Sequence, residues 1–168
     1  MTNPAGAKKQ VIGVFSQDWQ YKMAQVLKLL GSEHALIVHS QGLDEIRLDA
    51  ATNVVELKDG VISQYEINPQ QFGFSKRSET ELNELVASST KSSLALIKQS
   101  MTDDTSAAAD IVSLNAGAAI YASGVATNLA NGIAMAQDAI STGLANERFN
   151  ELVRVTKMMH EAWSEKAS

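Results

Sequence analysis

The sequence contains no cysteine among its 168 residues. This absence excludes disulfide bonds, thiolate nucleophiles and cysteine-bound zinc, so any metal ion must take oxygen or imidazole ligands. Proline is also scarce, with two residues, and aromatic side chains make up 5% of the chain. Residues Met1–Ala5 include no apolar run long enough for a signal peptide. Together with the lack of cysteine, this predicts a cytoplasmic protein.

Basic side chains are in the minority as well, with 14 Lys and Arg against 19 Asp and Glu and a net charge of -5. Surfaces that bind nucleic acid usually carry a basic stripe, so this acidic balance argues against a nucleic-acid partner. The content of 45% apolar and 20% charged residues is typical of a soluble globular protein. A chain of this length can form one domain with a sizeable core.

The longest stretch without a formal charge runs from Ile111 to Gln137 and has 27 residues, which is long enough to cross a bilayer. It also contains seven Ser, Thr, Asn or Gln residues and three glycines. These polar and small residues are unfavourable in the centre of a membrane span. We therefore expect a pair of alanine-rich buried helices here.

Apolar periodicity predicts strands early in the chain and helices later. Residues 11–15 and 35–39 are short apolar runs, and a helix is expected between them, so the three elements would form a parallel crossover unit. The apolar stripe of that helix comprises Trp19, Met23, Val26, Leu27 and Leu30. A hairpin should follow, with strands at 54–57 and 61–67 and the turn at Asp59-Gly60. Val61, Tyr65 and Ile67 would face the core.

The remainder of the chain reads as helical. The expected ranges are about 79–99, 105–123, 126–142 and 145–165, with a break in the first near Ser88–Ser93. The sequence thus predicts an α/β fold with a partial, mostly parallel sheet, one hairpin, flanking helices and a helix-rich C-terminal half. Parallel sheets covered by helices normally have more strands than this. We therefore expect residues 1–168 to be a single, truncated α/β domain.

Seven short motifs follow one another along the chain. They are TNPA at 2–5, QVIGV at 10–14, VLKLLGSEHALIVH at 26–39, GLDEI at 42–46, ELKDG at 56–60, PQQFG at 69–73 and LNAGAAIYASG at 114–124. In this order they resemble the C-terminal half of the anthranilate phosphoribosyltransferase family. The resemblance implies an enzyme of tryptophan biosynthesis that moves the phosphoribosyl group of phosphoribosyl pyrophosphate onto the amine of anthranilate, releases pyrophosphate and uses Mg²⁺.

Asp44 and Glu45 are the candidate metal ligands. From the residues alone, two adjacent carboxylates after an apolar strand either begin a solvated turn or hold a cation. The resemblance implies the second role, because the adjacent Asp and Glu of the family's DGLDE segment hold Mg²⁺ beside the diphosphate. Magnesium prefers oxygen ligands and is often bound by one or two carboxylates plus substrate phosphates. The chain departs from the family pattern at Ser40 and Gln41, where glycine and an acid are common.

Several parts of the family pattern do not occur in residues 1–168. The glycine-rich diphosphate loop, the Lys-His-Gly-Asn segment, the N-terminal helical domain and an arginine that helps to hold anthranilate all precede the TNPA motif in the family. Ala87–Ser89 and Ser93 replace a Gly-Gly-Asp run and an Asn. We therefore expect this chain to be inactive alone. Missing strands would leave a sheet edge and helix faces uncovered, which predicts self-association or pairing with the missing half.

Other polar residues have simpler expected roles. His39 should bond to the backbone at the end of its strand, whereas His34 and His160 lack a second ligand at metal spacing and are expected at the surface. Asn115 should be a buried hydrogen-bonding residue, and Asn3-Pro4 a fixed loop.

Two rival functions are consistent with parts of the sequence. One is a non-catalytic binding module of the same fold, which the missing diphosphate loop favours and the retained Asp44 and Glu45 oppose. The other is half of a pyrimidine nucleoside phosphorylase, to which the GLDEI and LNAGAAIY segments are less well suited.

Overall fold

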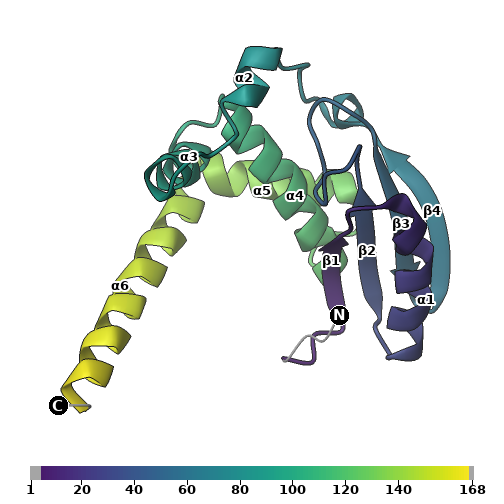
Figure 1. Ribbon diagram of the computed structural model, residues 1–168, viewed down its shortest axis with the longest axis horizontal. Helices are drawn as coiled ribbons and strands as arrows, with labels where there is room; N and C mark the ends of the chain where they lie inside the picture. Colours follow the sequence, from purple (N-terminus) through teal and green to yellow (C-terminus); the bar gives the residue numbers. More distant parts are fainter. Residues whose placement is uncertain (1–4, 167–168) are drawn as a thin grey trace.

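The computed structural model describes residues 5–166 and contains one four-stranded sheet with helices on both faces (Figure 1). The strands are β1 (Lys9–Gly13), β2 (His34–His39), β3 (Thr52–Lys58) and β4 (Val61–Ile67), and they lie in that order. The helical elements are η1 (Gln17–Trp19), α1 (Gln20–Leu29), η2 (Pro69–Phe72), α2 (Glu79–Asn83), α3 (Thr90–Thr102), α4 (Ala107–Ser123), α5 (Leu129–Ser141) and α6 (Leu144–Lys166). The α/β class, the hairpin and the helix-rich C-terminal half are confirmed.

Strand directions differ in one respect from the sequence-based expectation. β1 and β2 are parallel, but β2 pairs with β3 and β3 with β4 in antiparallel fashion, so the described sheet is mixed and not mostly parallel. The reason is the connection after β2. A parallel return needs a crossover, usually with a helix, whereas the segment 40–51 is an irregular loop that reverses the chain beside β2.

β2 is the centre of the core and is buried on both faces, as its continuous apolar run predicted. Ala35 and Ile37 pack with α1, and Leu36 and Val38 pack with α4 and α5 on the other face. This alternation follows from the two-residue repeat of a strand. The sheet is therefore held between α1 and the α4–α5 pair.

The apolar stripe predicted for α1 is confirmed in part: Leu27 is buried in the core and Met23 packs against it, whereas the other predicted positions face outward. Trp19 and Leu30 are 49% and 62% exposed, while the fully buried positions include Gln20 and Ala24. The Gln20 side-chain amide donates hydrogen bonds to the carbonyls of Ile37 and Asn53, at 2.7 and 2.8 Å. These bonds satisfy a buried polar group and rotate the helix so that part of its apolar surface faces outward.

The hairpin between β3 and β4 has its turn where it was predicted. Asp59 and Gly60 adopt φ values of 49° and 77°, which a tight two-residue turn of this kind requires at both positions. Ile67 is buried and Tyr65 is half-buried, as expected, but Val61 is 67% exposed. Val61 pairs with Lys58 directly beside the turn, at the tip of the hairpin.

One predicted helix is two helices in the structure. α2 ends at Asn83 and α3 begins at Thr90, where the Ser89 side chain caps the new helix. Arg77, just before α2, ties this region to α4 by donating to Asp110 and to the carbonyl of Thr105. The break predicted near Ser88–Ser93 is therefore confirmed.

α4 and α5 cross at two glycines. A Cβ atom on Gly132 would lie 2.3 Å from the carbonyl oxygen of Gly117, and one on Gly117 would lie 2.5 Å from the Cα of Ile133. Such distances leave no room for any side chain. The two helices account for the long uncharged stretch, and no helix within residues 5–166 combines the length and apolar character that a membrane crossing needs.

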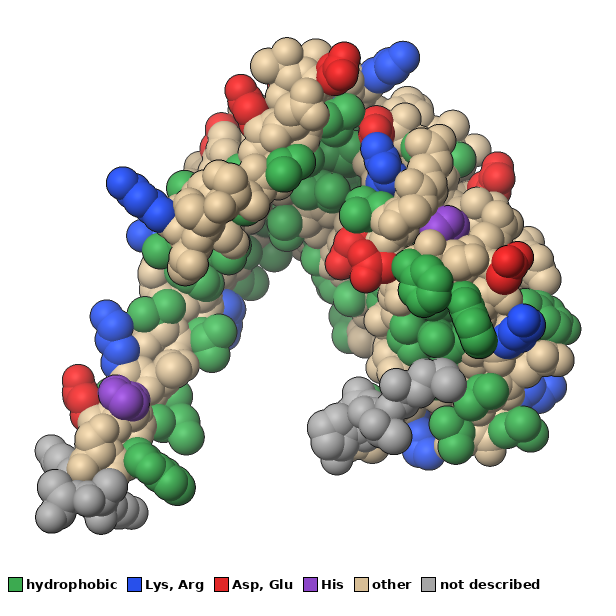
Figure 2. Space-filling view, in the orientation of Figure 1, with side chains coloured by type: hydrophobic (Ala, Val, Ile, Leu, Met, Phe, Trp, Pro, Cys, Tyr) green, Lys and Arg blue, Asp and Glu red, His purple; other side chains and the backbone are tan. Residues whose placement is uncertain are grey.

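α6 extends away from the rest of the molecule (Figure 1). The space-filling view shows a deep hollow between this helix and the sheet, with hydrophobic side chains along its wall (Figure 2). Leu152, Met159 and Trp163 repeat at helical spacing on α6 and are 63%, 69% and 77% exposed. No element within residues 5–166 covers this apolar face.

Candidate functional site

The loop after β2 begins with a tight turn. Ser40 and Leu43 exchange two backbone hydrogen bonds, of 3.0 and 2.8 Å, around Gln41 and Gly42. Both central residues have positive φ values, 46° and 86°. Ser40 is fully buried and its hydroxyl donates to the carbonyl of Ala51. The two positions that depart from the family pattern thus form an ordered turn.

His39, the last residue of β2, supports this turn through the backbone, as the sequence predicted. Its Nδ1 lies 2.7 Å from the carbonyl oxygen of Val14 and can only donate there. Nε2 is then the acceptor that faces the N–H of Gly42, at 3.5 Å. The ring therefore links the ends of the two parallel strands to the loop.

Asp44 is packed against the carboxyl end of β1. A Cβ atom added to Gly13 would lie 1.6 Å from the carbonyl oxygen of Asp44, so only glycine fits at this position. The carboxyl ends of parallel strands are where open α/β sheets bind ligands. The acidic pair therefore lies at the edge of the sheet that the sequence-based interpretation required.

Ile46, which follows the acidic pair, is bound by a residue 69 positions away. The Asn115 side chain of α4 accepts from the Ile46 N–H at 3.0 Å and donates to the Ile46 carbonyl at 2.9 Å. It also donates to the Ile111 carbonyl within its own helix, at 3.0 Å. The expected role of Asn115 as a hydrogen-bonding residue is confirmed, and its side chain is half-buried.

Asp44 and Glu45 are both exposed, and neither carboxylate accepts a hydrogen bond from another described residue. Partial burial raises the pKa of the Glu45 carboxyl, and the adjacent negative charge of Asp44 raises it further. A cation would relieve this repulsion. Residues 5–166 contain no group of three or more His, Asp or Glu side chains arranged to hold a metal. A cation held by this pair would take most of its ligands from water or from another molecule.

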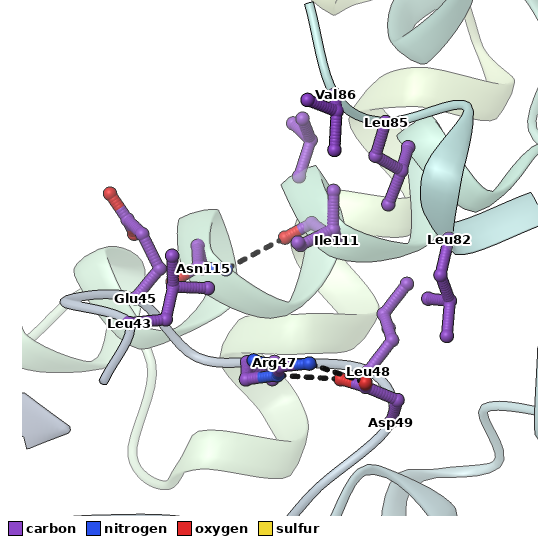
Figure 3. A pocket seen from close by; sticks show the side chains of 11 residues that line it. Leu43, Glu45, Arg47, Leu48, Asp49, Leu82, Leu85, Val86, Ile111 and Asn115 are labelled. Carbon is purple, nitrogen blue, oxygen red and sulfur yellow. Dashed lines mark hydrogen bonds and ion pairs between the residues drawn. The ribbon is translucent and has the colours of Figure 1, made fainter. Parts of the chain in front are cut away.

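A cavity of about 540 Å³ opens beside Glu45, and Figure 3 shows the side chains around it. Its walls come from the loop after β2, the end of α2 with the residues that follow it, and the first half of α4. They are Leu43, Glu45, Arg47, Leu48, Asp49, Leu82, Leu85, Val86, Ile111, Val112 and Asn115. Arg47 is paired with Asp49, with an Nε–Oδ1 distance of 2.7 Å. The cavity is therefore mainly apolar, with the Glu45 carboxylate as its unpaired charge among the described residues.

The surface position expected for His34 is wrong. His34 is 5% exposed, and its Nε2 lies 2.7 Å from the Glu56 carboxylate. The Tyr121 hydroxyl donates to the same carboxylate oxygen at 2.7 Å, and the Tyr121 ring meets the His34 ring edge-on. These polar groups come from β2, β3 and α4, far apart in the sequence, so no local pattern could have revealed them. They lie at the opposite end of β2 from Asp44.

His160 is exposed on α6, as expected, and Asn3 and Pro4 lie outside the described residues.

Comparison with known proteins finds a matching family and several similar proteins. A model of the glycosyl transferase family, a/b domain, matches residues 1–146. Anthranilate phosphoribosyltransferase from Ectopseudomonas mendocina is 49% identical over 166 residues, which cover 96% of this chain and 47% of that protein. The enzyme of the same name from Pseudomonas paraeruginosa is 47% identical with the same coverage.

Solved structures agree with these matches. The crystal structure of anthranilate phosphoribosyltransferase from Thermus thermophilus has a TM-score of 0.77 and 34% identity, and covers 91% of this chain and 45% of that one. The enzyme from Saccharomyces cerevisiae in complex with PRPP and Mg has a TM-score of 0.69 at 21% identity over 83% of this chain and 40% of that one, a likeness of fold.

The chain spans about half the length of the curated relatives it matches. The family match nevertheless covers most of the chain, and the fold agrees with it. The chain belongs to the glycosyl transferase family, of which it carries the a/b domain region.

Proposed function

We propose that this chain contributes the magnesium-binding carboxylates of an enzyme that transfers a phosphoribosyl group to anthranilate in tryptophan biosynthesis. One observation carries the proposal: Asp44 and Glu45, which have no ion-pair partner among residues 5–166, lie on an anchored loop at the carboxyl end of the parallel strands. The names of the relatives that match nearly the whole chain supply the reaction. Because those relatives are about twice as long, residues 1–168 would be one part of a larger α/β domain.

The reaction places clear demands on such a site. A bond forms between the anthranilate nitrogen and the first carbon of the ribose, the bond from that carbon to pyrophosphate breaks, and the amine loses a proton. The bonding electrons leave with pyrophosphate, so negative charge grows on the leaving group. Stabilising that charge and orienting the two substrates are the main routes to catalysis. Asp44 and Glu45 would serve the first by holding a cation beside the diphosphate.

The residues present are suited to Mg²⁺. Two hard carboxylate oxygens with open coordination positions resemble the sites in which Mg²⁺ keeps several waters and completes its octahedron with substrate phosphates. Bound there, the ion would neutralise charge on the pyrophosphate. The protein's part is to keep both carboxylates in place through Gly13 and the loop contacts.

The proposal includes a polypeptide partner. β1 is an edge strand of the described sheet, and the apolar face of α6 lies open beside a hollow (Figure 2). Exposed strand edges and large apolar surfaces favour association. We propose that the portion of the relatives beyond the matched 47% fills this hollow. The cytoplasmic location predicted from the sequence belongs to the same proposal.

Analytical ultracentrifugation tests whether the chain associates with the proposed polypeptide partner. Alone, the chain should self-associate with increasing concentration. Added polypeptide corresponding to the unmatched portion of the Ectopseudomonas mendocina protein should convert it to a one-to-one complex. Replacing Met159 and Trp163 by serine should weaken that complex, whereas Lys157→Ser on the polar side of α6 should not. A compact monomer that ignores the added polypeptide would contradict this part of the proposal.

Activity is tested in a chimera in which this chain replaces the matching part of the Ectopseudomonas mendocina protein. The chimera should convert anthranilate and phosphoribosyl pyrophosphate, and Asp44→Asn with Glu45→Gln should reduce the rate by about 100-fold or more. Glu66→Gln, an exposed carboxylate on β4, is the control and should retain the rate. Full activity without the two carboxylates would refute their role, and full turnover by this chain alone would refute the need for a partner.

Each of the two alternative functions predicts a different experimental result. A nucleic-acid-binding module would retard DNA or RNA in gels with a steep dependence on salt, which the net charge of -5 opposes. A nucleoside phosphorylase half would support phosphorolysis of pyrimidine nucleosides in the chimera.

A further inference from the structure

Asn115 binds the loop that bears the candidate metal ligands, although it belongs to a different part of the chain. We propose that Asn115 is a positioning residue for the Asp44–Glu45 pair and sets the affinity of the site for divalent cations. The inference rests on the proposed function for the identity of the ligands. It goes further by naming the residue of α4 on which their placement depends.

The geometry of the contact is that of a clamp. Asn115 accepts from the N–H of Ile46 and donates to the carbonyl of the same residue, at 3.0 and 2.9 Å. Two bonds to one residue fix the peptide groups on both of its sides. The first of these peptide groups joins Ile46 to Glu45, so the clamp determines where the Glu45 backbone lies.

The Asn115 amide is itself held in one orientation. Its Nδ2 group uses its second hydrogen to reach the Ile111 carbonyl at 3.0 Å. Both donor hydrogens are therefore engaged, and one bond already reaches the oxygen. Asn115 has little capacity left for a substrate, so it acts on the site through the loop and not by contact with the reacting atoms. Figure 3 shows Asn115 beside Glu45, with its hydrogen bond toward Ile111 as a dashed line.

The loop is held from two sides at this point. Gly13 packs against the Asp44 carbonyl from β1, and Asn115 binds Ile46 from α4. The Ile46 side chain is fully buried in the core between them. The two carboxylates make no hydrogen bonds of their own with other described residues. Their positions therefore depend on the backbone on either side.

Placement matters for the ion in question. Mg²⁺ demands near-ideal octahedral geometry at short distances, so a carboxylate that moves with a loosened loop binds it less well. Residues that orient metal ligands typically contribute about 10- to 100-fold in affinity. We expect an effect of this size from Asn115.

Two variants on the same helix separate positioning from general stability. Asn115→Ala removes the clamp, and Tyr121→Phe removes the hydrogen bond to Glu56 at the other end of α4. Mn²⁺ serves as the probe, titrated into the full chain with pyrophosphate and followed by electron paramagnetic resonance, while urea unfolding reports stability. Asn115→Ala should weaken Mn²⁺ binding by about 10- to 100-fold. Tyr121→Phe should lower stability and leave Mn²⁺ affinity unchanged.

Amide hydrogen exchange gives a second readout that needs no metal. Asn115→Ala and the similarly sized Asn115→Leu should both speed exchange at residues 44–46, and Tyr121→Phe should not. Unchanged exchange at these residues would overturn the inference, as would equal loss of Mn²⁺ affinity in the Tyr121 variant. Failure of both Asn115 variants to fold would assign the residue to the fold alone. If the unsubstituted chain binds no Mn²⁺, the titration is repeated in the chimera. Absence of Mn²⁺ binding there would refute the proposed function, whereas the positioning role is decided by exchange.

Discussion

Replacing Gly13 by alanine tests the placement of the acidic pair from the opposite side. Gly13 does not need the left-handed backbone conformation that favours glycine, so its backbone would accept alanine. The obstacle is the contact with the loop. The new Cβ atom would lie 1.6 Å from the Asp44 carbonyl oxygen and 2.4 Å from its carbonyl carbon. Real Cβ atoms essentially never approach closer than 3.0 Å.

The size of the effect follows from these distances. Relief of the overlap requires a shift of about 1.4 Å, the difference between 3.0 and 1.6 Å, and the loop must take most of it because β1 is held in the sheet. Overpacking of this kind costs about 1–3 kcal/mol, offset by about 0.4–1 kcal/mol from the reduced freedom of the unfolded chain. A net loss of about 1–2 kcal/mol corresponds to a fall in Tm of about 2–8 °C.

Mn²⁺ titration with pyrophosphate and thermal unfolding of the full chain check this prediction. We expect Mn²⁺ affinity to fall by about tenfold or more, since ligand displacement of about 1 Å is large for such a site. Gly124→Ala is the matched control. It strains a φ of 83° at the end of α4, beside the flexible Lys9 side chain and far from the loop. Equal affinity in the Gly13→Ala and unsubstituted chains, with unchanged amide signals at Asp44, would refute the packing argument.

Three further changes have defined outcomes. Gly132→Ala should lower the free energy of unfolding by about 1–3 kcal/mol in urea, because its Cβ would lie 2.3 Å from the Gly117 carbonyl; greater stability would contradict the close crossing. Glu56→Gln should cost about 1–3 kcal/mol by calorimetry, since it weakens the buried bonds to His34. Hydrogen bonds from Ser78 lower the pKa of Glu81 to about 2, so this group stabilises the fold above pH 4.5 and loses that effect as the pH falls from about 4.5 to about 2. Amide signals of α2 should report the loss in that window, and Glu81→Gln should abolish it.

Local patterns in the sequence predicted much of the fold. The continuous apolar run at 35–39 was sufficient for a strand buried on both faces, because such burial needs no alternation. Asp59-Gly60 defined the hairpin turn through its tolerance of positive φ. The helices of the second half begin and end within a few residues of their predicted limits, apart from the break between α2 and α3.

Predictions of how helices, strands and side chains pack against one another were less accurate. The stripe of α1 was correct at Met23 and Leu27 but not at Trp19 and Leu30. Gln20 forms hydrogen bonds with carbonyls of β2 and β3, and these do not follow from helical periodicity. The antiparallel return from β2 to β3 depended on a loop without repeating signals. His34 is buried because Glu56 and Tyr121 meet it from two other elements.

The candidate site likewise has features that local sequence predicts and features that depend on tertiary packing. The sequence alone determined that two adjacent carboxylates follow a buried strand, in an order of motifs that a family shares, since these are properties of neighbouring residues. Only the tertiary structure decided what holds them. The Gly13 contact and the Asn115 clamp join residues 31 and 69 positions apart, and packing at such separation is fixed by the assembled core and not by local preference.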